Sequence, residues 1–455
     1  MKTLIQNGKI VLHTGEIYGD LLIDNEKIIA MGIGLKGLGK VDQVIDASDK
    51  LIIPGLIDAH VHMPWKIGEF HSTDNFNLGT RAAVYGGVTT IIDFAIPEKG
   101  ELLPEAVQKR RKEAENFCYT DFGFHVAINH FRESLVEEIK ETVKLGVPSF
   151  KLYMLYPGLQ VRDGEIYQIM QWVKKAGGLI GVHAESHDII DFLITRFVSQ
   201  SKLDPYYHYL SRPDFVEAAA IQRLLFLNQI VNGKLYFVHV SSGLSLELIN
   251  KAKNQGQKVY AETCPQYLLL TSEKYKEPEG NLFLASPSFK TTSDCEALWE
   301  GIEHGKVDFV STDHCPFSRS QKDKYKDDFT KIPNGIPGVE TRLPLLITEG
   351  FWHRNIPLER IVQMMSYNPA RILGLYPQKG TLQVGSDADL VIFDPDKEFV
   401  IQNKKLHMNV DWSPYEGFQC RGFPNLVMRR GEILCRQGEW IADKARGKFI
   451  VRRIS

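Results

Sequence analysis

The 455-residue sequence lacks the features that would place it in a membrane, secreted or nucleic-acid-binding class. It contains no run of about 18 uninterrupted apolar residues, and its first residues include no apolar core of a signal peptide. Its formal net charge is only -2, so bulk charge implies no nucleic acid partner. Repeats with a period of about 20 to 50 residues and low-complexity segments are also absent. We therefore expect a cytoplasmic globular protein with no membrane contact.

Paired cysteines are missing as well. The six cysteines lie at positions 118, 264, 295, 315, 420 and 435, and none forms a Cys-x-x-C pair. This spacing suggests neither a disulfide framework nor a thiolate zinc site. Free, mostly buried thiols are expected.

The sequence does contain a regular alternation of short β-type runs with segments of helical composition. Eight β-type runs occur, from "LIIPGLIDAHVH" at Leu51 to "VDFVSTDH" at Val307. Two of the intervening segments, "SLVEEIKETVKLG" and "LSLELINKAKNQG", end at a glycine, which is typical of a helix C-cap. Eight strands that alternate with helices predict an α/β fold of the (β/α)8 TIM-barrel type.

The two ends of the chain differ from this pattern. Residues 1–50 and residues 379–455 consist of short strand-like runs separated by turns. We expect the two ends to meet in one small β-sandwich domain, with a short tail after its C-terminal part. Residues 51–378 would then form the barrel.

Potential metal ligands stand at the ends of several predicted barrel strands. The first run ends "DAHVH", so His60 and His62 share one face of a strand, together with Asp58. A His-x-His pair alone has a non-ligand explanation about as often as a ligand one. Three other strand ends add His183 in "GVHAE", His239 in "FVHVS" and Asp313 in "STDH". Because barrel sites form at the C-terminal ends of the strands, this nitrogen and oxygen set predicts a site for zinc or a related divalent ion.

A lysine on the fourth predicted strand is unusual in this position. In "SFKLYM", Lys151 alternates with apolar neighbours and is expected to face the mouth of the barrel beside the metal ligands. A buried ammonium next to a dication is unfavourable. Three readings remain open from the residues: a neutral amine, a lysine converted to an anion, or a side chain whose head reaches water.

Taken together, the pattern His60-x-His62, Lys151, His183, His239 and Asp313 resembles the ligand set of the amidohydrolase superfamily with a binuclear metal centre. The resemblance implies that His60, His62 and Asp313 hold one metal and that His183 and His239 hold the other. It also implies that carbon dioxide carboxylates Lys151 and that the carbamate bridges the two ions. Zinc is the expected metal, with manganese as the alternative.

Longer matches resemble the dihydropyrimidinase and D-hydantoinase branch of that superfamily. They include "GTRAAVYGGVTTIIDF", "SFKLYMLY" and, most specifically, "KIPNGIPGVE". The resemblance implies a hydrolase that opens the ring amide of hydantoins or 5,6-dihydropyrimidines to give N-carbamoyl amino acids. It also implies a small cyclic amide or imide as the partner molecule, and a homotetramer or homodimer.

The same resemblance assigns roles to four residues. Asp313 is expected to act as the general base and then as the acid toward the leaving ring nitrogen. Tyr156 would polarise the substrate carbonyl. Ser286 in "ASPSF" and Asn334 in "KIPNG" match positions whose backbone groups hold the ring edge.

Some positions depart from the branch and leave alternatives open. Ser186 and His187 follow "HAE" where hydantoinases usually have Asn-Gly, and Cys264 lies in "ETCPQYL", which is closer to dihydroorotase and allantoinase usage. The loop 63–75, with Trp65 and Lys66, is also atypical. An allantoinase-type ring hydrolase is therefore an alternative, and a non-catalytic scaffold relative is a second one, although all six ligand positions are intact.

Overall fold

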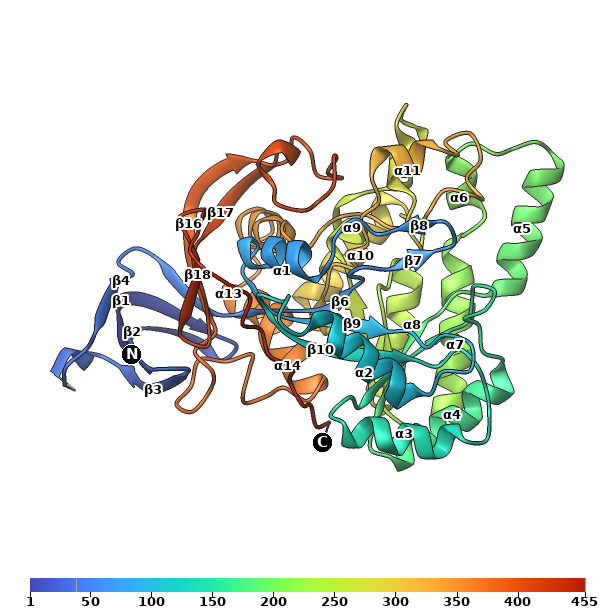
Figure 1. Cartoon of the computed structure of the whole chain (residues 1–455). Helices are drawn as coiled ribbons and strands as arrows, with labels where there is room; N and C mark the ends of the chain where they lie inside the picture. The colour runs from blue at the N-terminus through green and yellow to red at the C-terminus, as the bar shows by residue number, and fades with distance from the viewer. Residues whose placement is uncertain (38, 455) are drawn as a thin grey trace.

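Two large β-sheets organise the chain, and a computed structural model describes residues 1–37 and 39–454 of it (Figure 1). The first sheet has eight strands, each paired in parallel with its neighbours. In spatial order these are β6 (Leu56–Val61), β9 (Val88–Ala95), β10 (Asp121–Ala127), β11 (Ser149–Tyr153), β12 (Leu179–His183), β13 (Leu235–Phe237), β14 (Val259–Thr263) and β15 (Phe309–Val310). The predicted alternation therefore produces one parallel sheet.

This sheet curls back on itself. Val61, at the end of β6, forms a parallel bridge with His314, which follows β15. The backbone N–H of His62 donates to the carbonyl oxygen of His314 over 2.9 Å. These contacts join the first and last strands, so the predicted TIM-barrel fold is confirmed.

Helices pack around the outside of the barrel (Figure 1). The longer ones are α1 (Phe76–Tyr85), α2 (Leu103–Ala114), α3 (Leu135–Lys144), α4 (Asp163–Lys175), α5 (His187–Ser199), α7 (Asp214–Val231), α8 (Gly243–Asn254) and α10 (Thr292–Glu303). The shorter helical segments are η1 (Leu35–Gly37), α6 (Tyr206–Leu210), α9 (Pro265–Leu269), η2 (Ser272–Lys276), η3 (Gly280–Phe283), α11 (Arg319–Asp323), α12 (Arg342–Leu346), η4 (Ile347–His353), α13 (Leu358–Val362), η5 (Gln363–Tyr367), α14 (Asn368–Ile372) and η6 (Asn403–Lys405). Gly146 and Gly256, just beyond α3 and α8, have φ angles of 87° and 85°, as a glycine C-cap requires. Within the described residues, no helix is long and apolar enough to cross a membrane.

The second sheet joins the two ends of the chain. Its strands are β1 (Lys2–Leu12), β2 (Gly15–Asp24), β3 (Lys27–Gly32), β4 (Gln43–Asp46), β5 (Leu51–Pro54), β16 (Leu390–Val400), β17 (Gln419–Arg429), β18 (Glu432–Arg436) and β19 (Glu439–Trp440). The antiparallel pairing of β5 with β16 links the N-terminal and C-terminal halves of the sheet. Buried residues of both halves, such as Ile10 and Leu426, share one apolar cluster. The termini thus form a separate sheet domain beside the barrel, while the exact domain limits stay a prediction. A two-stranded hairpin, β7 (Lys66–Ile67) and β8 (Phe70–His71), makes a third, small sheet.

The first predicted strand, "LIIPGLIDAHVH", is divided between the two large sheets. Leu51–Pro54 pairs with β16, whereas Leu56–Val61 belongs to the barrel. Gly55 lies at the division, where a Cβ atom would come within 2.2 Å of Thr89 Oγ1. The chain can therefore cross from one sheet to the other only because this residue has no side chain.

The last residues of the described chain pack against the barrel end remote from the predicted ligands. Arg452 is 1% exposed, and its guanidinium donates to Ser149 Oγ over 2.8 Å and to the carbonyl oxygen of Phe124. The backbone N–H of Ile450 donates to the carbonyl of Phe122 over 2.8 Å. This segment therefore caps the barrel and does not extend the terminal sheet.

A buried charge network joins the barrel to the terminal sheet and yields a stability prediction. Lys379 Nζ lies 2.6 Å from Asp121, 2.7 Å from Asp389 and 3.0 Å from Asp387, and all four side chains are nearly inaccessible. Lys379→Met would remove the cation that the three buried carboxylates share and would leave Asp389 without an ion pair, so we expect the free energy of unfolding to fall by about 3–5 kcal/mol. Denaturant unfolding followed by circular dichroism measures this.

Lys27→Met is the matched control, because Lys27 pairs with the same Asp387 over 2.7 Å but has a side chain that is 47% exposed. Its loss is expected to cost about 0–1 kcal/mol. Equal losses in the two variants would contradict the interpretation.

Candidate metal centre

The residues that the sequence nominated converge on one cavity at the C-terminal ends of the barrel strands. His60 and Lys151 lie within β6 and β11, and His183 ends β12. His62, His239 and Asp313 lie in the loops that directly follow β6, β13 and β15. The cavity has a volume of about 890 Å³, and its walls include all six residues together with Tyr156, Ser286 and Asn334.

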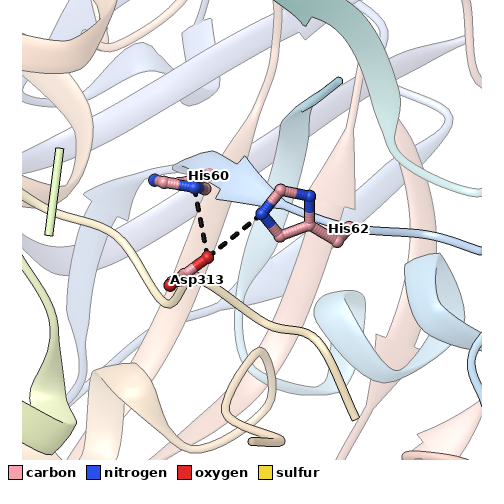
Figure 2. Close-up of side chains that lie close together, drawn as sticks. All are labelled: His60, His62 and Asp313. Carbon is pink, nitrogen blue, oxygen red and sulfur yellow. Dashed lines mark ion pairs between the residues drawn. The ribbon is translucent and has the colours of Figure 1, made fainter. Parts of the chain in front are cut away.

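Three of these side chains are in direct contact. Asp313 Oδ1 lies 3.1 Å from His60 Nε2 and 3.2 Å from His62 Nε2, as Figure 2 shows. Donor atoms bound about 2.0–2.1 Å from one tetrahedral ion lie roughly 3.3 Å apart. The three donors therefore have the spacing of a shared metal ion.

The other two histidines lie beside this group. The ring centroids of His183 and His239 are 4.6 Å apart, and those of His239 and His60 are 5.5 Å apart. Nδ1 of His239 is buried and has no hydrogen-bond partner in the described part of the chain. An unpartnered buried nitrogen is unfavourable, so a ligand is expected to satisfy it.

The protonation states of these groups suit a cation. Burial lowers the pKa of His60, His62, His183 and His239, so all four imidazoles are neutral near pH 7 and carry a lone pair. Burial alone would raise the pKa of the Asp313 carboxyl, but His60 and His62 hold it below its usual value. The donor set is therefore neutral nitrogens and an ionised oxygen, which fits a divalent metal.

Two buried carboxylates that the sequence reasoning missed orient the histidines. Glu262 on β14 is inaccessible, and its Oε1 lies 2.7 Å from His60 Nδ1. Burial raises the pKa of Glu262 to about 8, so without a cation in the cavity this acid keeps its proton near neutral pH. A metal ion at His60 Nε2 would favour the ionised form of Glu262, which then accepts a hydrogen bond from His60 Nδ1. A carboxylate behind a ligating histidine is the usual support for such a ligand.

Glu185 plays the same part for His183. Glu185 Oε2 lies 2.7 Å from His183 Nε2 and accepts a hydrogen bond from Arg212 over 2.9 Å. Nδ1 of His183 is therefore the ring nitrogen that remains available to bind a metal ion. The signal for both acids was present in the sequence, since "HAE" and "AETC" each place a glutamate at the end of an otherwise apolar strand.

Lys151 is buried among the ligands. It is 2% exposed, and its Nζ lies 5.3 Å from the ring centroids of Phe94 and Tyr153. It forms no ion pair with any described residue, and burial lowers its pKa to about 8. The sequence left three interpretations of Lys151 open, and this burial excludes the one in which the amine reaches water.

Asp58 shares a face with the two histidines in the sequence pattern but has another task. Its carboxylate accepts hydrogen bonds from Thr312 N over 3.1 Å and from Thr312 Oγ1 over 2.7 Å. It therefore fixes the backbone just before Asp313. His314, on the other side of Asp313, points away from the cavity and bonds Asp74 over 2.8 Å.

The backbone is strained at three of the cavity residues. Tyr156, His239 and Asp313 have φ angles of 76°, 40° and 51°, in the left-handed region that non-glycine residues rarely adopt. Such conformations persist only where the surroundings impose them, and they concentrate at functional sites. The short strands β13 and β15 end at these turns, which aims both ligands into the cavity.

Three polar residues face the ligands from the other cavity walls. The ring centroid of Tyr156 is 5.2 Å from that of His183, and burial raises the pKa of Tyr156 to about 12. Its hydroxyl therefore keeps its proton at neutral pH and can donate. Within the described residues, Ser286 Oγ and Asn334 Oδ1 are buried without a hydrogen-bond partner.

Three of the residues that depart from the branch, Trp65, Lys66 and His187, line the cavity. Trp65 stacks on His62 with ring centroids 4.6 Å apart, and Lys66 lines the rim. Ser186 is the N-cap of α5, and His187 begins that helix at the cavity wall. Cys264 is buried at the N-terminus of α9.

Comparison with known proteins agrees with this site. The model of the amidohydrolase family matches residues 51–434. A D-hydantoinase of Ralstonia pickettii is 38% identical, with 100% of this chain and 99% of that protein covered. A D-phenylhydantoinase of Escherichia coli O1:K1 is 40% identical, with 100% and 98% covered. The crystal structure of dihydropyrimidinase from Brevibacillus agri superposes with a TM-score of 0.98 at 36% identity, with 100% of both chains covered. This chain belongs to the amidohydrolase family, in its branch of D-hydantoinases and dihydropyrimidinases.

Proposed function

We propose that this protein is a metal-dependent cyclic amidase that opens the ring amide of hydantoins or 5,6-dihydropyrimidines to N-carbamoyl amino acids. The names of its relatives support this activity. The observation that carries the proposal is the shared cavity. It contains both the donor set for metal ions and three polar residues, Tyr156, Ser286 and Asn334, that face those donors.

In this proposal, His60, His62 and Asp313 would hold one divalent ion and His183 and His239 would hold a second, with zinc as the expected metal. Lys151, as a carbamate, would supply an oxygen ligand to both. The neutral amine would attack carbon dioxide: the nitrogen–carbon bond forms as one carbon–oxygen π bond opens, and the nitrogen gives a proton to water, which leaves the carbamate anion. Support comes from its burial without a carboxylate partner and from a pKa lowered to about 8, since both favour the neutral nucleophile.

When bound, the metals would supply an activated water and polarise a carbonyl. Asp313, held ionised by its histidine neighbours, takes the proton of the attacking water and returns it to the ring nitrogen as the carbon–nitrogen bond breaks. The Tyr156 hydroxyl donates to the oxygen on which negative charge develops. Backbone groups of Ser286 and Asn334 hold the edge of the ring.

Tyr156→Phe is expected to lower kcat by about 100-fold or more, because the hydroxyl acts on charge that exists only in the transition state. KM and metal content should change little, since the ring and all six ligand positions remain. Steady-state kinetics on dihydrouracil and hydantoin, together with metal analysis, measure this.

Tyr153→Phe is the matched comparison, because Tyr153 lines the same cavity with a buried hydroxyl. In the proposed mechanism only the Tyr156 hydroxyl donates a hydrogen bond to the substrate carbonyl, so this variant should keep kcat within a few-fold. If Tyr153→Phe lost kcat and Tyr156→Phe did not, the roles assigned here would be wrong.

A substrate panel separates the cyclic amidase from an allantoinase or a scaffold. The panel contains dihydrouracil, 5-substituted hydantoins and allantoin, and mass spectrometry detects the ring-opened products. Turnover of dihydrouracil or hydantoins above allantoin is expected. Preferential opening of allantoin would show that the protein is an allantoinase-type hydrolase. If the metal-loaded protein opened none of the rings, a non-catalytic scaffold would be favoured.

We also propose that the chain assembles as a homotetramer or homodimer. Its full-length similarity to hydantoinases supports this, since such assemblies are usual in the branch that the sequence resembles. Light scattering of the purified protein tests it, and a monomer at micromolar concentration would refute it.

A further inference from the structure

The segment Leu284–Pro287, which carries Ser286, is held by buried side chains from three different parts of the chain. Lys322 Nζ donates to the carbonyl oxygen of Leu284 over 2.8 Å. His208 Nε2 lies 2.8 Å from the carbonyl oxygen of Ala285, and the Tyr267 hydroxyl donates to that of Pro287 over 2.9 Å. Three carbonyl groups of this short segment are thus fixed in direction.

Ser286 is the exception in this segment. Among the described residues, no donor to its carbonyl oxygen is found, and Ser286 is half-buried in the wall of the cavity. A ligand with an N–H group at this point of the cavity could donate to that carbonyl.

The Leu284 carbonyl also connects the two loops that face the metal ligands. It accepts a second hydrogen bond, from the backbone N–H of Gly335 over 2.9 Å. Gly335 directly follows Asn334, whose Oδ1 is buried and unpartnered. One oxygen atom therefore ties the Ser286 loop to the Asn334 loop, and Lys322 donates to that same atom.

Lys322 is an unusual residue type for a buried contact with a backbone carbonyl. It lies on α11, is fully buried, and forms no ion pair with any described residue. The ring centroid of Trp412 lies 5.8 Å from Nζ. Burial lowers its pKa to about 7. A buried amine without an acid partner is unfavourable, and an apolar side chain of similar size would avoid that cost.

We propose that Lys322, with His208 and Tyr267, forms a clamp that presents the Ser286 and Asn334 loops to the substrate ring. Lys322 is a positioning residue, because it acts through the Leu284 carbonyl and does not line the cavity. The proposal rests on the proposed function, and the substrate class it concerns is a ring whose amide edge offers both an N–H and a carbonyl. The clamp fixes the distance between the loops that receive these two groups.

Lys322→Met removes the amine and keeps a chain of similar volume. We expect KM for dihydrouracil and hydantoin to rise on the order of tenfold, the worth of one net hydrogen bond, with kcat within a few-fold of wild type. Metal content should be unchanged, and the midpoint of thermal unfolding should hold or rise. Lys322→Gln, which keeps a donor of shorter reach, should fall between Met and wild type in KM.

Tyr267→Phe provides a second, independent variant that keeps the ring and its packing. The same signature is expected: a raised KM, a retained kcat and a wild-type metal content. If Lys322→Met does not fold, Tyr267→Phe decides. Lys174→Met is the matched control, because Lys174 Nζ also donates to one backbone carbonyl, that of Val231 over 2.7 Å, on the outside of the barrel. It should leave both kinetic constants unchanged.

An unchanged KM in the folded variants would overturn the clamp. So would a loss of metal or of kcat without a change in KM, because those results would assign the residues to general stability. In both cases the wild-type protein still opens rings, and the proposed function stands. A wild-type protein that opens no ring would overturn the proposed function, and the clamp with it.

Discussion

Lys151→Ala is expected to abolish turnover of cyclic amides and to lose most of the bound metal. The substitution removes the side chain that, as a carbamate, would contribute to both metal positions of the proposed centre. Loss of a residue that merely supports a ligand costs about 10- to 100-fold in affinity or activity, so loss of a bridging ligand should exceed 100-fold. Metal analysis and steady-state kinetics on the same preparation measure both effects.

A rescue experiment distinguishes the carbamate from a simple structural role. Short carboxylic acids added to Lys151→Ala should restore part of the activity, because a carboxylate can occupy the position of the carbamate. Lys322→Met is the matched control for metal content, since it removes another buried lysine of the same barrel. Full activity and full metal content in Lys151→Ala would refute the binuclear centre.

Asp313→Asn should lower kcat by about 10³-fold, with weaker metal binding as a second effect. The amide cannot accept the proton of the attacking water or return it to the ring nitrogen, and general acid–base catalysis is typically worth about 10²- to 10⁴-fold. The wild-type pKa of Asp313 is held below its usual value, so the carboxylate is ionised throughout the neutral range. In the wild type, activity that depends on this carboxylate is present at neutral pH and is lost only as the pH falls through that lowered pKa.

Asp191→Asn is the matched control, because Asp191 lines the same cavity but is exposed at its rim. It is expected to keep kcat within a few-fold. A near wild-type kcat in Asp313→Asn would show that another group is the base.

The sequence predicts the barrel and the position of the candidate ligands at its mouth, because both follow from local periodicity. Strand alternation predicts that His60 and Lys151, each on its own strand, point into the mouth of the barrel. Position at a strand end brings His183, His239 and Asp313 to the same cavity. The resemblance to a known branch adds Tyr156, Ser286 and Asn334, which alternation alone could not select from loop residues.

Contacts between residues far apart in the sequence could not be predicted from local patterns. Asp58 has the same periodicity as His60 but bonds Thr312, which is 254 residues away. Glu262 and Lys322 reach His60 Nδ1 and the Leu284 carbonyl from distant elements, and no local pattern reveals either contact. Gly55 lies where an apparently continuous strand divides, and the close approach of Thr89 that leaves no room for a Cβ atom there becomes visible only in three dimensions.

Ring opening before and after metal removal tests the central claim most directly. The protein is treated with a chelator, and the opening of dihydrouracil and hydantoin is measured by mass spectrometry before and after zinc and bicarbonate are added back. The account predicts turnover in the untreated protein, loss of turnover in the metal-free protein, and recovery only when both metal and bicarbonate are supplied. Undiminished ring opening by protein shown to contain no metal would contradict it.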